Sequence, residues 1–73
     1  MNARKIKGVI SRIESDKTYW KYELRNSIDE REAIDTEVEA YELDLQIENI
    51  RGYISGLDRA LDKLKMLSES IDK

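Results

Sequence analysis

Residues 29–48 read DEREAIDTEVEAYELDLQIE, and this acidic stretch separates segments of different charge. Residues 1–25 carry seven Lys or Arg and three Asp or Glu, a net charge of +4. Residues 26–50 carry one base and nine acids, a net of −8, and residues 51–73 carry five bases and four acids, a net of +1. Because opposite charges attract, the pattern predicts that the basic first helix folds back antiparallel on the acidic middle.

The composition predicts an all-α fold. Charged residues make up 40% of the 73 residues and hydrophobic residues another 40%, while the chain has no Pro and three Gly. This composition with regularly spaced apolar residues is typical of long helices or coiled coils. We expect one small domain over residues 1–73, an antiparallel helical hairpin or three-helix bundle with coiled-coil-like packing. Its predicted helices span about 3–25, 28–50 and 54–71.

Apolar residues in the first predicted helix recur at alternating steps of four and three. This is the 3.5-residue repeat of a helix that packs on another helix. Lys17 interrupts the apolar pattern, but its methylene stem can lie along the stripe with the ammonium group at the edge. The repeat comprises Ile6, Ile10, Ile13, Lys17, Trp20 and Leu24.

The middle of the chain carries two apolar stripes that point to nearly opposite sides of a helix, given ~100° per residue. A helix with two apolar faces is expected to lie between two neighbours. One is the first helix, and the other is the C-terminal segment or a second copy of the chain. The first stripe is Ile34, Val38, Tyr41 and Leu45. The second is Leu43, Ile47, Ile50 and Ile54, and it continues in step through Leu57, Leu61, Leu64 and Ile71.

Two positions compete for the first turn. Ser27 and Glu30 have the spacing of a capping box, which predicts a turn at 26–28. Thr36 and Glu39 form a second box, which places the turn at 35–36 as the alternative.

Gly52 and Gly56 leave the end of the chain open between two structures. If these glycines break the helix, the result is a three-helix bundle. If they do not, a helix of ~40 residues presents an apolar stripe that needs a partner.

The short chain predicts self-association. A core of this size supplies only ~3–5 kcal/mol, and a chain without Cys has no disulfide to add to it. We therefore expect a homodimer whose two copies meet along the second stripe. The residues assigned to this contact are Ile47, Ile50, Ile54, Leu57, Leu61 and Leu64.

The residue types that are missing argue against catalysis. Without Cys and His, the chain lacks thiolate nucleophiles, the commonest general base and the commonest transition-metal ligand. We expect no enzymatic activity, no catalytic residue, no cofactor and no metal site. The longest uncharged apolar runs are too short to span a membrane, and the first residues lack the apolar core of a signal peptide. These features predict a cytoplasmic protein that does not bind membranes.

The stretch 17–25 mixes aromatic and basic residues. Trp20 falls on the helical repeat and is expected in the core, whereas Tyr19 and Tyr22 fall beside it. Exposed tyrosines on a helix are typical anchors of protein interfaces, with Arg25 as a companion. Direct nucleic-acid binding is disfavoured by the net charge of −3, because phosphate contacts supply most of that affinity.

These observations predict a non-enzymatic protein-binding module, a small regulator or inhibitor of a larger protein. In size and composition the chain resembles small inhibitors that phages and mobile elements direct at host defence enzymes. An alternative is an acidic DNA mimic, in which the regularly spaced carboxylates of Glu37, Glu39 and Glu42 occupy the basic cleft of a nucleic-acid-binding enzyme. Pairing of the acidic run with the basic first helix is the competing interpretation.

A remote alternative is enzymatic. Glu39-x-x-Glu42 and Glu69-x-x-Asp72 resemble the ExxE and ExxD carboxylate pairs of MazG-like nucleotide pyrophosphatases. The resemblance implies Mg²⁺ held by carboxylates from two helices against a nucleotide triphosphate.

Overall fold

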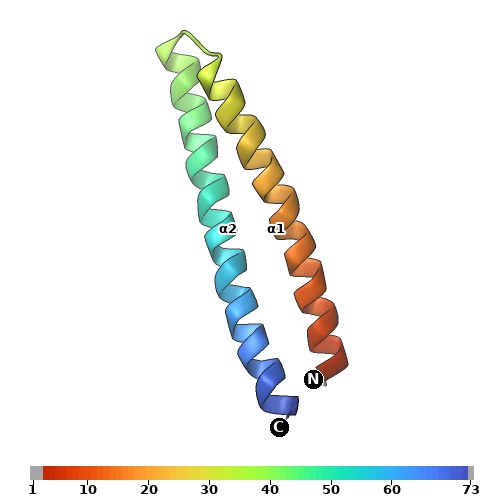
Figure 1. Ribbon diagram of the computed structural model, residues 1–73. Helices are drawn as coiled ribbons and strands as arrows, with labels where there is room; N and C mark the ends of the chain where they lie inside the picture. The colour runs from red at the N-terminus through yellow and green to blue at the C-terminus, as the bar shows by residue number, and fades with distance from the viewer. Residues whose placement is uncertain (1–2, 73) are drawn as a thin grey trace.

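The computed structural model describes residues 3–72 and consists of two long helices packed side by side. Helix α1 spans Ala3–Glu32 and helix α2 spans Glu37–Asp72. The two helices run antiparallel, so both termini lie at the same end of a rod of 55 × 14 × 13 Å (Figure 1). The all-α hairpin is confirmed, whereas the third helix of the predicted bundle is not present in this part of the chain.

The turn occupies residues 33–36. The backbone amide of Ala33 donates to the carbonyl of Glu30 at 3.1 Å, and that of Ile34 donates to Arg31 at 3.4 Å. These short-range bonds tighten the last turn of α1. The carbonyl of Thr36 accepts from the amide of Ala40 at 3.0 Å, which makes Thr36 the first capping residue of α2. The alternative turn at 35–36 is therefore confirmed.

The predicted turn at 26–28 is wrong because Ser27 has another role. Its side chain is buried between the helices, and its hydroxyl accepts a hydrogen bond from Nε2 of Gln46 at 3.0 Å. The hydroxyl is therefore used across the hairpin instead of as a helix cap. Helix α1 continues for five residues beyond Ser27.

Helix α2 runs through Gly52 and Gly56 without a break. Neither glycine has a positive φ, and a Cβ atom at either position would meet no atom within 4 Å. A glycine costs about 1 kcal/mol relative to Ala inside a helix. The apolar register that α2 keeps against α1 outweighs this cost. Residues 37–50 of the second predicted helix therefore form one helix with the third predicted helix, 54–71, whereas residues 28–32 belong to α1.

The contact between the helices follows a 3.5-residue repeat along both elements. The repeat in α1 extends past Leu24 to Ser27 and Arg31. Lys17 forms an ion pair with Asp58, and Nε of Arg31 bonds to Oδ1 of Asp44 at 2.9 Å. The two pairs are fourteen residues apart on each helix, which shows that the register is constant over two heptads. Exposed pairs are worth only ~0–1 kcal/mol, so they fix the register more than they stabilise the fold.

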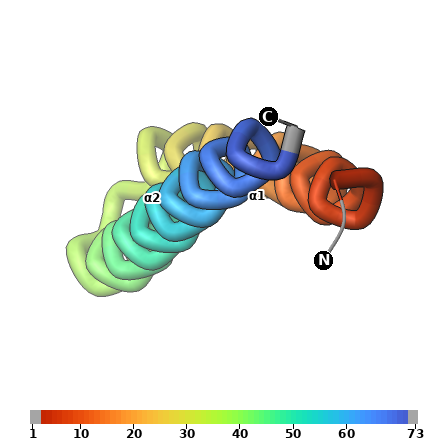
Figure 2. Tube along the Cα trace, turned by 90° about the horizontal axis from the view of Figure 1, so that it is seen from below, coloured from red at the N-terminus to blue at the C-terminus, as the bar shows by residue number. Residues whose placement is uncertain are grey.

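The core is a single layer between the helices. The buried apolar side chains among the described residues are Ile6, Ala40, Ile47, Ile50 and Leu61. The second stripe therefore packs on α1, whereas Val38, Tyr41 and Leu45 of the first stripe are exposed. Within residues 3–72, α2 packs on α1 alone, so the C-terminal segment is not the second neighbour of the middle helix (Figure 2). A second copy of the chain as that neighbour stays a prediction.

The position of the turn also corrects the predicted charge pairing. Since the turn lies inside the acidic stretch, the basic segment 3–25 lies beside residues 51–72 and not beside the acidic middle. Residues 26–50, with their net charge of −8, gather at the turn end of the rod. Residues 3–25 and 51–72 carry eleven bases and seven acids, a net of +4. The molecule is therefore electrically polarised along its length.

Candidate protein-binding surfaces

The turn end of the hairpin is a strongly acidic surface. We define the acidic tip as residues 26–50, which contain nine carboxylates and one base, Arg31. Within residues 3–72, two of these carboxylates form ion pairs, Asp44 with Arg31 and Glu48 with Arg51 at 3.9 Å. The others are exposed to solvent and form no such pair there: Asp29, Glu30, Glu32, Asp35, Glu37, Glu39 and Glu42. Most of the acidic charge is thus available to a partner.

Three apolar side chains stand among these carboxylates on the outer side of α2. Val38, Tyr41 and Leu45 are 73%, 64% and 49% exposed. Their spacing of i, i+3 and i+7 places them on one face of the helix. This is the spacing with which an amphipathic helix inserts anchors into a groove of another protein. We call these three residues the tip anchors.

A second candidate surface lies near the middle of the rod, where three aromatic rings from both helices meet. The ring centroids of Tyr19 and Trp20 are 5.3 Å apart, and those of Trp20 and Tyr53 are 5.0 Å apart. Both contacts are edge-on, the geometry that ring quadrupoles favour. A mainly apolar cavity of about 280 Å³, open to solvent, is lined by Trp20, Asn49, Ile50 and Tyr53. We call Tyr19, Trp20 and Tyr53 the aromatic cluster.

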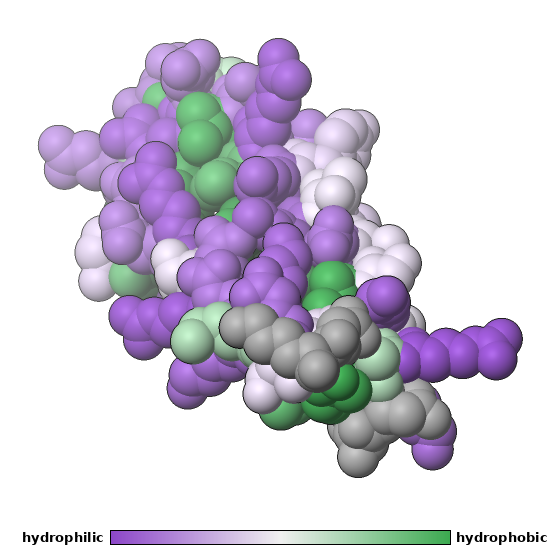
Figure 3. Space-filling view, turned by 60° about the horizontal axis from the view of Figure 1, so that its bottom comes forward, coloured by the Kyte–Doolittle hydropathy of each residue, from purple (hydrophilic) through white to green (hydrophobic). Residues whose placement is uncertain are grey.

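Hydrophobic side chains reach the surface in separate patches among hydrophilic ones in the view toward the end that carries the termini (Figure 3). Met66, Leu67 and Ile71 are exposed at that end of α2. Scattered exposed apolar residues are common on soluble proteins, so the helical spacing of the tip anchors and the ring contacts of the aromatic cluster are more informative than exposure alone.

The structure divides the predicted partner-binding residues between different places. Glu37, Glu39 and Glu42 lie on the acidic tip, whereas Tyr19 belongs to the aromatic cluster. Tyr53 of that cluster follows Glu39 by almost four turns of α2, which is roughly 20 Å along an α-helix. These residues therefore do not form one compact site.

Tyr22 and Arg25 are both exposed on α1. Their role as interface residues stays a prediction. Tyr53 was missed by the sequence reasoning because its contact with Trp20 depends on the register between the helices. Trp20 itself is half-buried and lines the cavity.

The residues assigned to self-association face α1 of the same chain. Ile47, Ile50 and Leu61 are buried there, and Ile54, Leu57 and Leu64 are half-buried. A homodimer formed along this stripe would require the hairpin to open, because α1 already covers the stripe. Any dimer of the closed hairpin must use another surface.

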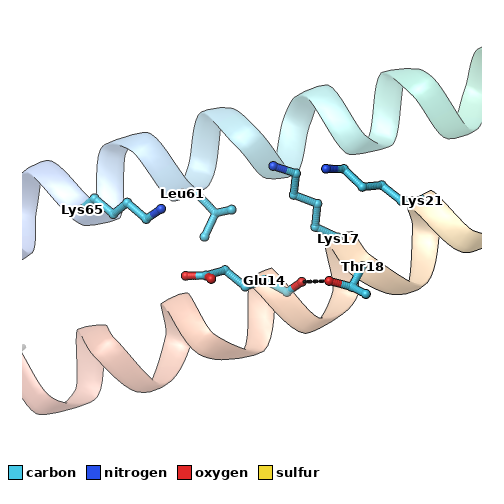
Figure 4. Close-up of a pocket in the computed structure, with 6 residues that line it drawn as sticks. All are labelled: Glu14, Lys17, Thr18, Lys21, Leu61 and Lys65. Atoms are coloured by element: carbon cyan, nitrogen blue, oxygen red, sulfur yellow. Dashed lines mark hydrogen bonds between the residues drawn. The ribbon is translucent and has the colours of Figure 1, made fainter.

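A polar pocket lies between the helices (Figure 4). Its lining residues place it closer than the aromatic cluster to the end that carries the termini. It contains three lysines, Lys17 and Lys21 from α1 and Lys65 from α2, around the side chain of Leu61. Lys17 is paired with Asp58, and Glu14 extends a carboxylate into the same space. The charges are therefore mixed, as on an ordinary solvated face between two helices.

The carboxylate pairs that resemble the MazG-like enzymes lie far apart. Glu39 and Glu42 are near the start of α2, and Glu69 is in its last turns. The rise of an α-helix separates Glu42 from Glu69 by about 40 Å. The side chain of Asp72 lies outside the described part of the chain. One hairpin cannot bring both pairs to a single Mg²⁺, and among the described residues no group of three or more acidic side chains could hold a metal ion.

No helix in the described part of the chain is long and apolar enough to cross a membrane. Comparison with models of protein families, with curated proteins and with solved structures finds no match to this chain. Function is therefore inferred from the surfaces of the hairpin.

Proposed function

We propose that this chain is a non-enzymatic protein-binding module, a small regulator or inhibitor whose acidic tip docks on a larger protein. The observation that supports this proposal is the row of exposed tip anchors, Val38, Tyr41 and Leu45. They are surrounded by carboxylates that form no ion pair within residues 3–72. The partner surface that fits the tip is an apolar groove with a basic rim. Apolar anchors supply affinity in such contacts, while the charges accelerate association and select the partner.

The shape of the molecule supports docking through the tip. The hairpin end is narrow and projects from a rod of 55 × 14 × 13 Å, so it can enter a concave surface. The anchors also lie in the first turns of α2, next to the turn at 33–36, where α1 does not cover their face. No rearrangement of the hairpin is needed to present them.

A DNA mimic is the second candidate function. The observation that favours it is that the turn gathers nine carboxylates at one end of the rod instead of leaving them beside basic residues. In this case the tip would occupy the basic cleft of a nucleic-acid-binding enzyme, and the carboxylates would supply nearly all of the affinity. The two functions differ in whether the tip anchors contribute.

The test uses a photoactivatable phenylalanine analogue at Tyr41 to identify the crosslinked partner, whose affinity for purified variants is then measured. Protein docking predicts that Tyr41→Ser and Leu45→Ser each weaken binding at least roughly tenfold, as expected for buried interface anchors. A DNA mimic predicts that these variants bind normally. It also predicts that the triple charge reversal of Glu37, Glu39 and Glu42 to Lys abolishes binding and that added salt weakens it steeply.

Met66→Ser is the matched control. Met66 is 69% exposed and lies three heptads after Leu45 on the same outer face of α2, at the other end of the rod. Its substitution should leave both the fold and the affinity unchanged. If Met66→Ser weakens the complex while both anchor variants bind as the wild type does, the tip is not the docking surface.

A further inference from the structure

The aromatic cluster lies near the middle of the rod and is only partly used by the hairpin. Tyr53 lies close to the midpoint of α2, and it is 50% exposed although its ring contacts Trp20. The hairpin itself has a one-layer core with several half-buried positions, including Ile13, Leu57 and Leu64. Small domains of this kind are commonly completed by a partner subunit. The cluster is therefore a natural centre for a second interface.

Four exposed residues of α2 form a row beside Tyr53. They recur every seven residues and therefore lie on one side of the helix. The row has opposite charges at its ends and neutral residues in the middle, and Tyr53 lies level with its midpoint. Its members, which we call the charged row, are Glu42, Asn49, Gly56 and Lys63.

Two charged rows that run antiparallel, one from each copy, are complementary in charge and size. A two-fold axis at its midpoint brings Glu42 opposite Lys63 of the second copy and Asn49 opposite Gly56 of the second copy. The side chain of Asn49 then lies opposite Gly56, which has no side chain. The same rotation lays the acidic tip of each copy, with its charge of −8, along the basic half of the other, with its charge of +4.

Gly56, like Gly8 and Gly52, has no explanation within one hairpin. Its φ is not positive, and a Cβ atom there would meet nothing within 4 Å. A glycine in the middle of a helix is destabilising relative to Ala, so a close approach of another molecule is a physical reason for its presence.

We propose that two copies of this chain associate antiparallel through the aromatic cluster and the charged row, with the two-fold axis beside Tyr53. Each copy presents the same patch, as a two-fold interface requires. The acidic tips then lie near opposite ends of the dimer, each beside the basic half of the other copy.

A charge swap tests the register of the dimer. Glu42→Lys and Lys63→Glu should each weaken the dimer roughly tenfold, because each change replaces two attractions in a two-fold dimer with two repulsions. The double variant should recover most of the wild-type affinity. The two positions lie three heptads apart on one helix, about 30 Å, so recovery cannot occur within a single chain. The measurement is sedimentation equilibrium over a hundredfold concentration range, with helicity followed by circular dichroism.

Gly56→Leu and Gly8→Leu form a matched pair. Both replace an exposed helical glycine with a good helix former, but Gly8 lies on α1, about three turns from Trp20 of the aromatic cluster. Gly56→Leu should weaken the dimer at least tenfold, whereas Gly8→Leu should dimerise as the wild type does. A wild-type chain that stays monomeric throughout the range overturns the proposal. So does a double charge variant no tighter than the singles, or a Gly56→Leu dimer as strong as that of Gly8→Leu.

Discussion

Ile47→Asp is expected to unfold the hairpin. Ile47 is 7% exposed and lies in the single-layer core between α1 and α2. Removing a buried Ile side chain costs about 2–5 kcal/mol, and a carboxylate placed there without a partner adds a desolvation penalty. The total exceeds the ~3–5 kcal/mol that a core of this size supplies. Circular dichroism at room temperature should show loss of most helical signal.

Leu45→Asp is the matched control for this result. Leu45 precedes Ile47 by two residues on the same helix and is 49% exposed. An exposed substitution of this kind changes the free energy of unfolding by about 0.5 kcal/mol or less. Comparing the helicity of the two variants shows which apolar stripe of α2 packs on α1 and which is exposed. If Leu45→Asp unfolds the chain and Ile47→Asp does not, the stripe that faces α1 has been assigned incorrectly.

Gly52→Pro should destabilise the hairpin by about 3 kcal/mol or more, because proline inside a helix removes one backbone hydrogen bond and clashes with the carbonyl four residues earlier. The structure places Gly52 in the interior of α2, sixteen residues after Thr36 and twenty before Asp72. A three-helix bundle with a turn near Gly52 would instead tolerate the proline. Urea unfolding followed by circular dichroism measures the difference.

Glu37→Pro is the control for the proline experiment. Glu37 is the first residue of α2, where the amide has no partner inside the helix and the fixed φ of proline suits the helix start. The preceding residue, Thr36, is not helical and can adopt the extended conformation that a following proline favours. We expect a change within about 1 kcal/mol, since one carboxylate near the helix dipole is also lost. Equal destabilisation by the two prolines would contradict the continuous α2.

The proposed function and the proposed dimer use different sets of residues as their main contacts. The acidic tip carries the anchors for a partner protein, and the aromatic cluster joins two copies near their middles. The tip-anchor variants change the affinity for the partner, whereas Gly56→Leu changes the monomer–dimer equilibrium, so the two proposals can fail separately.

The sequence by itself determined the helical fold and the faces of its helices. The repeat from Ile6 to Leu24 and the stripe from Leu43 to Leu64 both lie along the contact between α1 and α2, because a 3.5-residue spacing keeps apolar side chains on one side of a helix. The exposure of Tyr19 and Tyr22 and the partial burial of Trp20 also follow from their places relative to that repeat.

The tertiary structure alone decided where the chain turns and which stripe is covered. Two capping boxes competed for the turn, and local capping energies of about 1 kcal/mol could not separate them. Packing did so, because a turn at 33–36 lets the second stripe run against α1 without interruption through Gly52 and Gly56 and buries Ser27 against Gln46. The position of the turn exposed the first stripe and gathered the carboxylates at one end. Which charged segments lie side by side is decided only when the chain folds back on itself.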